Sequence, residues 1–199
     1  MLSEGYSDLS PVYPLIAQQI LDDYQIQSGI CLDIGTGPGY MGIELAKISN
    51  LEIYFVDIKG ETLIKTKENV TGCNLDNRLH YTEADVSALP FENNFADLIV
   101  SRGSLWFWAD QIKGLQEIYR VLRPGGVAFT GGGIGRYTPL SMRMRLKEKG
   151  RRAAQKKNEK ANFLSGAGLQ ELLDKTGLYG CRTISDVEGE DATWIEMRK

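Results

Sequence analysis

Short apolar runs along the chain alternate with segments in which apolar residues recur at helical spacing. Five of these runs have the length and composition of β-strands, and they cover residues 30–34, 53–57, 79–85, 97–101 and 127–130. The helical spacing is carried by Met41, Leu45 and Ile48, and later by Ile112, Leu115, Ile118, Tyr119 and Leu122. This β-α-β-α series favours a parallel sheet that is covered by helices on both faces.

The C-terminal part of the chain breaks this alternation. A helix is predicted over 166–176, with Ser165 as a candidate N-cap and Gly177 as the stop. Two strands follow near 179–187 and 192–198, with the turn residues EGED between them. Because so short a connection joins antiparallel neighbours, we predict an α/β fold with a mostly parallel seven-stranded sheet and a C-terminal antiparallel hairpin.

The length and charge of the chain narrow its class. A chain of 199 residues is expected to form one domain, 1–199, and its formal net charge of -3 gives no overall attraction to nucleic acid or to a membrane. The N-terminal sequence does not resemble a signal peptide, and no apolar run is long enough to span a bilayer. We therefore expect a cytoplasmic protein with no membrane partner. Cys31, Cys73 and Cys181 are widely separated, so we interpret them as reduced thiols.

A basic insertion is predicted over 134–162. Within it, residues 143–160 hold nine Lys or Arg against Glu148 and Glu159. We predict that 134–162 forms a largely helical lid over the substrate pocket, because its methionines and leucines offer an adaptable apolar surface. A permanently solvated helix and an RNA-docking stripe are the alternatives.

The stretch CLDIGTGPGY, residues 31–40, forms a glycine-rich turn after the first apolar run. A nucleotide-binding P-loop would continue with Gly-Lys-Ser/Thr, but here Tyr40 and Met41 follow Gly39. A dinucleotide fingerprint needs glycine at its sixth position, which is Tyr40 when counted from Gly35. The pattern is instead GxGxG, preceded by Asp33.

Several motifs together resemble those of class I S-adenosyl-L-methionine-dependent methyltransferases, especially small-molecule members. They are the GxGxG turn, Asp57 in YFVDIK, Asp85 in TEADV, LPFENNFADLIVS and LRPGG, within residues 29–131. The resemblance implies a Rossmann-like sheet, S-adenosyl-L-methionine as cofactor and S-adenosyl-L-homocysteine as product. It also implies that Asp57 accepts hydrogen bonds from the ribose hydroxyls and that Asp85 meets the adenine amino group. Taken alone, each aspartate is equally consistent with a helix cap.

The resemblance implies a set of cofactor-binding residues and a helical N-terminal cover, residues 1–28. The set comprises Tyr6, Asp33, Gly35, Thr36, Gly37, Gly39, Asp57, Ile58, Asp85, Val86, Ser101 and Arg102. Carboxylates at strand ends suit a ligand with a diol and an amino edge, because ligands of open α/β sheets bind at the carboxyl ends of the strands.

The residues that would contact the methyl acceptor are harder to recognise in the sequence than the cofactor motifs. Transfer from a sulfonium is an in-line displacement that needs orientation and water exclusion more than a catalytic side chain. The candidates for contact with the methyl acceptor are Arg102, Trp106, Trp108 and Tyr137, with Phe107 as a further aromatic. The alternative role is packing for Trp106, Phe107 and Trp108, and a surface salt bridge for Arg102. Gly131 to Gly133 and Gly135 are expected to leave room for a ligand or to form a flexible exit from the strand.

Other chemistries are disfavoured by the sequence. SRGS at 101–104 differs from the amino-adenine methyltransferase motif, and none of the cysteines has a neighbouring proline, as the cytosine C5 type requires. His80 has no second ligand nearby, so no metal site is expected.

The leading hypothesis is a methyltransferase acting on a small or medium-sized molecule, with a small-molecule acceptor ranked above nucleic acid as the partner. An RNA or protein methyltransferase that docks through 143–160, and a non-catalytic cofactor-binding module, are the alternatives.

Overall fold

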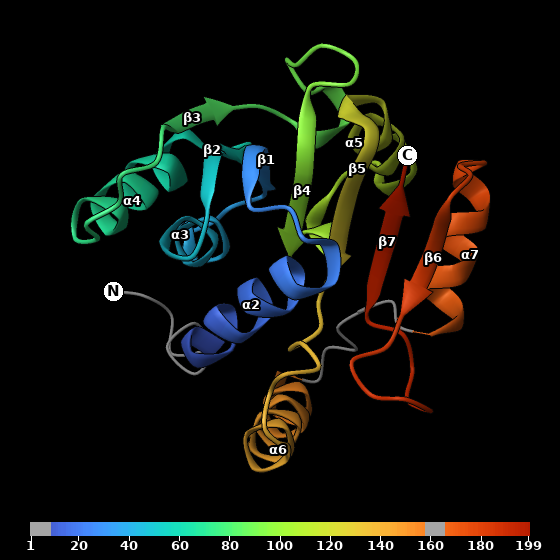
Figure 1. The fold of residues 1–199 in the computed structure, drawn as a ribbon. Coiled ribbons are helices and arrows are strands. Elements are labelled where there is room, and N and C mark those ends of the chain that lie inside the picture. Colours follow the sequence, from blue (N-terminus) through green and yellow to red (C-terminus); the bar gives the residue numbers. More distant parts are fainter. Residues whose placement is uncertain (1–8, 158–165) are drawn as a thin grey trace.

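The computed structural model describes residues 9–157 and 166–199, and for residues 150–157 only the course of the backbone. Its centre is a seven-stranded sheet with the order β3-β2-β1-β4-β5-β7-β6 (Figure 1). The strands are β1 Ser28–Ile34, β2 Asn50–Asp57, β3 Leu79–Glu83, β4 Ala96–Arg102, β5 Leu122–Gly131, β6 Cys181–Ile184 and β7 Trp194–Arg198.

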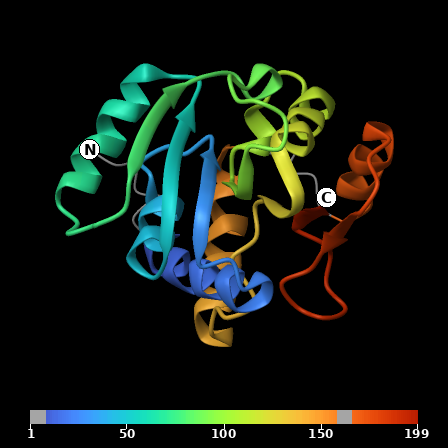
Figure 2. The same cartoon turned by 45° about the horizontal axis from the view of Figure 1, so that its top comes forward.

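The pairing of the strands confirms the predicted fold class. Strands β1 to β5 are mutually parallel, and β7 runs antiparallel to both of its neighbours, β5 and β6. The chain thus forms a Rossmann-like, mostly parallel sheet that ends in an antiparallel hairpin, seen from a second direction in Figure 2.

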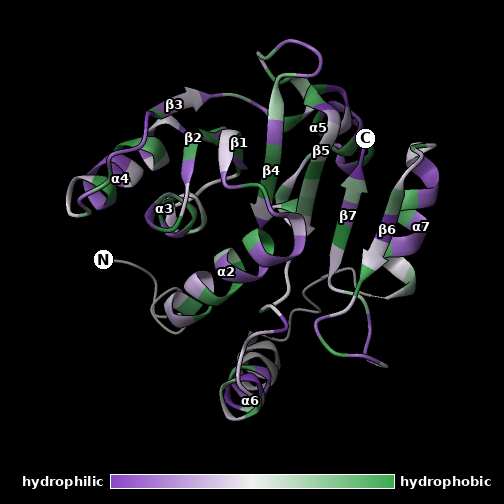
Figure 3. Ribbon diagram, in the orientation of Figure 1, coloured by the Kyte–Doolittle hydropathy of each residue, from purple (hydrophilic) through white to green (hydrophobic). Residues whose placement is uncertain are grey.

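Helices cover both faces of the sheet. They are α2 Tyr13–Tyr24, α3 Tyr40–Lys47, α4 Gly60–Thr71, α5 Gln111–Val121, α6 Leu140–Lys157 and α7 Ala167–Thr176. Side chains alternate between two cores along each strand, so Cys31 packs on the side of α2 and α3, whereas Leu32 and Ile34 pack on the side of α5 and α7. Figure 3 shows the hydrophobic residues along the central strands. Among the helices of the described residues, none is long and apolar enough to cross a membrane.

Several predicted boundaries differ from the structure, and two of the differences have a clear physical reason. The helical pattern was predicted to continue through Leu122, but α5 ends at Val121 and Leu122 pairs with Ala96 as the first residue of β5. Its side chain is buried against the same core as α5, which explains the misleading spacing. Strand β3 ends at Glu83 instead of residue 85, because Asp85 caps the short 3-10 helix Val86–Ala88.

The hairpin is shorter in its strands and longer in its connection than predicted. Strand β6 ends at Ile184, and the connection to β7 covers 185–193 instead of EGED alone. The carboxylate of Asp186, within this connection, accepts hydrogen bonds from the N–H groups of Ile134 and Gly135 and from Trp194 Nε1.

The glycines at and after the end of β5 pack against protein, so the prediction that they leave room for a ligand is wrong. A Cβ on Gly131 would overlap the backbone of Thr193, and one on Gly133 would overlap the indole of Trp194. On Gly135 it would lie 2.8 Å from Ile16 of α2. These glycines allow the chain to pass closely between α2 and the hairpin.

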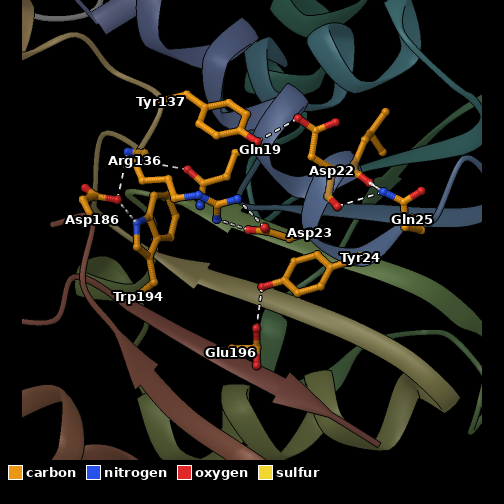
Figure 4. Close-up of polar contacts among 12 residues, drawn as sticks. Gln19, Asp22, Asp23, Tyr24, Gln25, Arg136, Tyr137, Asp186, Trp194 and Glu196 are labelled. Atoms are coloured by element: carbon orange, nitrogen blue, oxygen red, sulfur yellow. Dashed lines mark hydrogen bonds and ion pairs between the residues drawn. The ribbon is translucent and has the colours of Figure 1, made fainter. Parts of the chain in front are cut away.

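This passage is tied to α2 by polar contacts (Figure 4). Arg136 pairs with Asp23, the Arg136 N–H donates to Gln19, and Tyr137 donates to Asp22 Oδ2 at 2.8 Å. Helix α6 begins three residues after Tyr137, at Leu140, so these contacts hold the chain against α2 just before that helix.

The basic segment does not present all of its charge to solvent. Arg143 is only 5 % exposed; it donates to Gly135 O at 2.9 Å and lies 3.9 Å from Asp186. Lys147 pairs with Glu190 at 2.6 Å. Two of the cations counted in 143–160 are therefore engaged by the hairpin connection, which weakens the interpretation of the segment as a docking stripe.

Candidate functional site

A cavity of about 570 Å³ lies at the carboxyl ends of β1, β2, β3 and β4. It is lined by Ile34, Gly35, Gly37, Pro38, Asp57, Ile58, Lys59, Thr62, Lys65, Ala84, Asp85, Val86, Arg102, Gly103, Ser104, Phe107, Trp108 and Ala109. In the strand order, β1 and β4 are neighbours although β2 and β3 separate them in the chain. Such switch points are where open α/β sheets bind ligands, and the volume suits a cofactor.

The glycine turn forms one wall of this cavity. Gly35 has φ +63°, and a Cβ there would overlap the side chain of Ser104. Gly39 has φ +83° and is the N-cap residue of α3, and a Cβ there would lie 2.6 Å from Thr66 Cγ2. Larger residues would therefore be strained and would not fit, so the turn brings bare backbone to the cavity because only glycine permits this conformation.

Asp33 supports the turn from behind and does not line the cavity. It is 1 % exposed, and its Oδ2 accepts hydrogen bonds from Thr36 Oγ1 at 2.6 Å and from the Gly42 N–H at 2.9 Å. Burial raises the pKa of Asp33 to about 6, and these two hydrogen bonds oppose that shift. Thr36, Gly39 and Asp33 thus hold the backbone of the turn in shape.

Asp57 ends β2 at the cavity wall. Its Oδ2 accepts from the Gly37 N–H at 3.0 Å, and its Oδ1 accepts from the Lys59 N–H at 3.1 Å. A carboxylate has about four acceptor positions, so both oxygens retain capacity for the hydroxyls of a diol. Asp57 is therefore both a brace for the turn and a free acceptor at the cavity.

Asp85 combines a capping role with an open oxygen. Its Oδ1 accepts from the Ser87 N–H at 2.8 Å and from Ser87 Oγ at 2.7 Å, and these bonds lower the pKa of Asp85. Within 9–157 and 166–199, no residue donates to Oδ2. Ile58, which is 59 % exposed, and Val86 lie on the same wall and offer apolar surface to a flat ring.

The aromatic residues after β4 separate into different roles. Trp108 lines the cavity, but its Nε1 donates to Ser104 Oγ at 3.1 Å and its ring packs on Gly114. Trp106 packs beside Gly132 and does not line the cavity. Phe107 lines the cavity and is 81 % exposed. It is therefore the aromatic that is most free to meet a ligand.

The remaining candidates are distributed around the cavity. Arg102 lines it, whereas Ser101 is buried behind it and shares a hydrogen bond of 2.6 Å with Ser104. Tyr137 lies beside α2, away from the lining residues, and Tyr6 lies outside the described residues. No described side chain of α6 lines the cavity, so the lid remains a prediction.

Sequence reasoning missed the contribution of α4. Thr66 Oγ1 donates to Gly37 O at 2.7 Å, and Asn69 Nδ2 donates to Pro38 O at 2.8 Å, so this helix holds the outer side of the glycine turn. Lys59, Thr62 and Lys65 add polar groups to the cavity. Because α4 has few apolar residues, its hydrophobic pattern was too weak to delimit it.

Comparison with known proteins agrees with this geometry. The profile of a family described as "Methyltransferase domain" matches residues 32–130. A solved structure from Methanococcus maripaludis, described as "a putative s-adenosyl-l-methionine-dependent methyltransferase", has a TM-score of 0.80 and 33% identity, and the match covers 98% of this chain and 88% of that chain.

Two curated relatives match over a shorter range. A 2-methyl-6-phytyl-1,4-hydroquinone methyltransferase of Oryza sativa is 33% identical over 49% of this chain and 28% of its own length. A ubiquinone/menaquinone biosynthesis C-methyltransferase of Geotalea daltonii is 32% identical over 50% of this chain and 43% of its own. The chain thus matches less than half the length of these relatives. The structural match extends over nearly the whole chain, and on this basis the protein belongs to the class I S-adenosyl-L-methionine-dependent methyltransferases.

Proposed function

We propose that this protein transfers a methyl group from S-adenosyl-L-methionine to a small or medium-sized molecule. The observation that carries the proposal is the single cavity in which the glycine turn, Asp57 and Asp85 meet at the carboxyl ends of neighbouring strands. Each aspartate retains acceptor capacity toward the cavity after its bonds to the protein are counted.

The chemistry of these residues fits the cofactor. Asp57 would accept hydrogen bonds from the two ribose hydroxyls, and Asp85 from the adenine amino group, while Ile58 and Val86 would contact the ring. The pKa of Asp85 is lowered, so this carboxylate is ionised at neutral pH and ready to accept.

When bound, the cofactor supplies a methyl group on a positively charged sulfur. The acceptor atom would form a bond to the methyl carbon as the carbon–sulfur bond breaks, and the electron pair of that bond would stay on the sulfur of S-adenosyl-L-homocysteine. The protein contributes alignment of the reactants and exclusion of water. Phe107 and Trp108 would provide the apolar wall on the acceptor side.

Two observations support a small acceptor over a macromolecule. The names of the curated relatives refer to a hydroquinone and to the biosynthesis of ubiquinone or menaquinone, and all of these compounds are small molecules. The alternative of docking through the basic segment loses support because Arg143 is buried and Lys147 is paired.

The proposal is tested in two stages. Titration calorimetry should detect binding of S-adenosyl-L-homocysteine, and its absence at millimolar ligand would refute the proposal. A cell extract would then be incubated with the protein and methyl-labelled cofactor, and separated by size. Label in the low-molecular-mass fraction supports a small acceptor, whereas label confined to RNA or protein contradicts it.

A further inference from the structure

Arg102 has an unusual position among the charged residues of the cavity. It is the last residue of β4 and lines the cavity beside Gly103 and Ser104. Across residues 9–157 and 166–199 no carboxylate forms an ion pair with it. A partly buried guanidinium without a carboxylate partner is costly, so its position beside a cavity points to an anionic ligand.

The guanidinium of Arg102 is held in place by uncharged groups. Its Nε donates to Gly133 O at 3.1 Å and its Nη1 donates to Tyr13 Oη at 3.2 Å. The Arg102 Cζ also lies 4.9 Å from the centre of the Tyr13 ring. Tyr13 is itself buried and packs on Tyr40 with ring centres 5.4 Å apart. The side chain is therefore oriented before any ligand arrives.

One edge of this guanidinium is left for a ligand. Nε and Nη1 are engaged, whereas Nη2 donates to no residue in the described part of the chain. Nη2 carries two N–H groups, and a guanidinium meets a carboxylate with strong, charge-assisted hydrogen bonds.

The strand order indicates which part of the cofactor is near Arg102. Asp57 ends β2 and Asp85 follows β3, so the proposed contacts would put the adenosine moiety over that side of the sheet, and β4 lies on the other side of β1. The amino-acid tail would then extend from adenosine toward the glycine turn and β4. Its carboxylate is the only anionic group of S-adenosyl-L-methionine. The other cations that line the cavity, Lys59 and Lys65, belong to the Asp57 side.

We propose that Arg102 binds the α-carboxylate of the cofactor and that Tyr13 is a positioning residue that holds Arg102 for this contact. The inference rests on the proposed function and adds to it a role for α2. The alternative, that Arg102 anchors an anionic methyl acceptor, is separated from it by the test below.

The test compares two ligands that differ in the amino-acid tail, which carries the carboxylate. S-adenosyl-L-homocysteine has the amino-acid tail, whereas 5′-methylthioadenosine keeps adenosine and sulfur but lacks that tail. Calorimetry on Arg102→Ala should show about 10- to 100-fold weaker binding of S-adenosyl-L-homocysteine, and binding of 5′-methylthioadenosine within about twofold of wild type. Arg102→Lys keeps the charge but not the planar fork, so its affinity for S-adenosyl-L-homocysteine should lie between those of wild type and Arg102→Ala.

Tyr13→Phe tests the positioning role, because it keeps the ring and removes the hydroxyl that accepts from Nη1. Binding of S-adenosyl-L-homocysteine should weaken about threefold or more, again without a change for 5′-methylthioadenosine. Arg102→Lys and Tyr13→Phe also carry the test if Arg102→Ala does not fold.

Two results would overturn the inference. Equal losses for both ligands would show a structural role, and unchanged binding of S-adenosyl-L-homocysteine with reduced methyl transfer would show an acceptor anchor. If the wild-type protein binds neither ligand, the proposed function itself fails, which is a separate outcome.

Discussion

Replacing Asp57 by alanine is the most direct test of the cofactor site. The substitution removes both acceptor oxygens at the end of β2, including those that hold the N–H groups of Gly37 and Lys59. Since Asp57 lies at the cavity wall and not in the core, the sheet should still form. The expected effect is therefore on cofactor binding more than on folding.

The magnitude follows from the contacts that the carboxylate can make. Two hydrogen bonds from ribose hydroxyls to a charged acceptor should contribute about 2 to 3 kcal/mol in total to binding. This corresponds to about a 30- to 150-fold increase in the Kd for S-adenosyl-L-homocysteine. Asp57→Asn should not restore affinity, because both oxygens face backbone N–H groups and an amide would turn its NH2 toward one of them.

Calorimetry with S-adenosyl-L-homocysteine measures this change, and circular dichroism checks that the variant is folded. Glu61→Ala is the matched control, since Glu61 is an exposed carboxylate in the first turn of α4 and does not line the cavity. An unchanged Kd for Asp57→Ala in a folded protein would refute the ribose contact and leave Asp57 only as a brace for the glycine turn.

Three further predictions concern stability and the acceptor side. Because burial raises the pKa of Asp33 from 3.8 to about 6, its favourable contribution is present below pH 4 and lost as the pH rises through 6. Wild type should lose about 2 kcal/mol of unfolding free energy relative to Asp33→Asn between pH 4 and 7 in urea titrations, and parallel pH curves would contradict this. Phe107→Ala should reduce methyl transfer without lowering the melting temperature, whereas Trp108→Ala should lower the melting temperature. A lower melting temperature for Phe107→Ala and an unchanged one for Trp108→Ala would exchange the roles of the two residues. Arg143→Ala should lower the unfolding free energy measured in urea by about 3 kcal/mol, because it leaves the buried carboxylate of Asp186 without its cation. A loss below about 1 kcal/mol would show that α6 is held by other contacts.

The fold class and the main cofactor motifs could be predicted from the sequence because they depend on local features. Strand and helix periodicity are properties of neighbouring residues, and a glycine turn after a strand can be recognised from its spacing alone. Asp57 and Asp85 were predicted at strand ends, and parallel strands bring such ends to one edge whatever the loops contain.

Only the tertiary structure decided what each side chain does there. It placed Asp33 behind the turn instead of in the cavity, filled the space beside Gly131 and Gly133 with the hairpin, and left Phe107 more exposed than its neighbouring tryptophans. It also brought Tyr13 to Arg102 across 89 positions of sequence. Contacts between distant segments depend on how helices and loops pack on the sheet, and a residue's own neighbours in sequence carry no record of that packing.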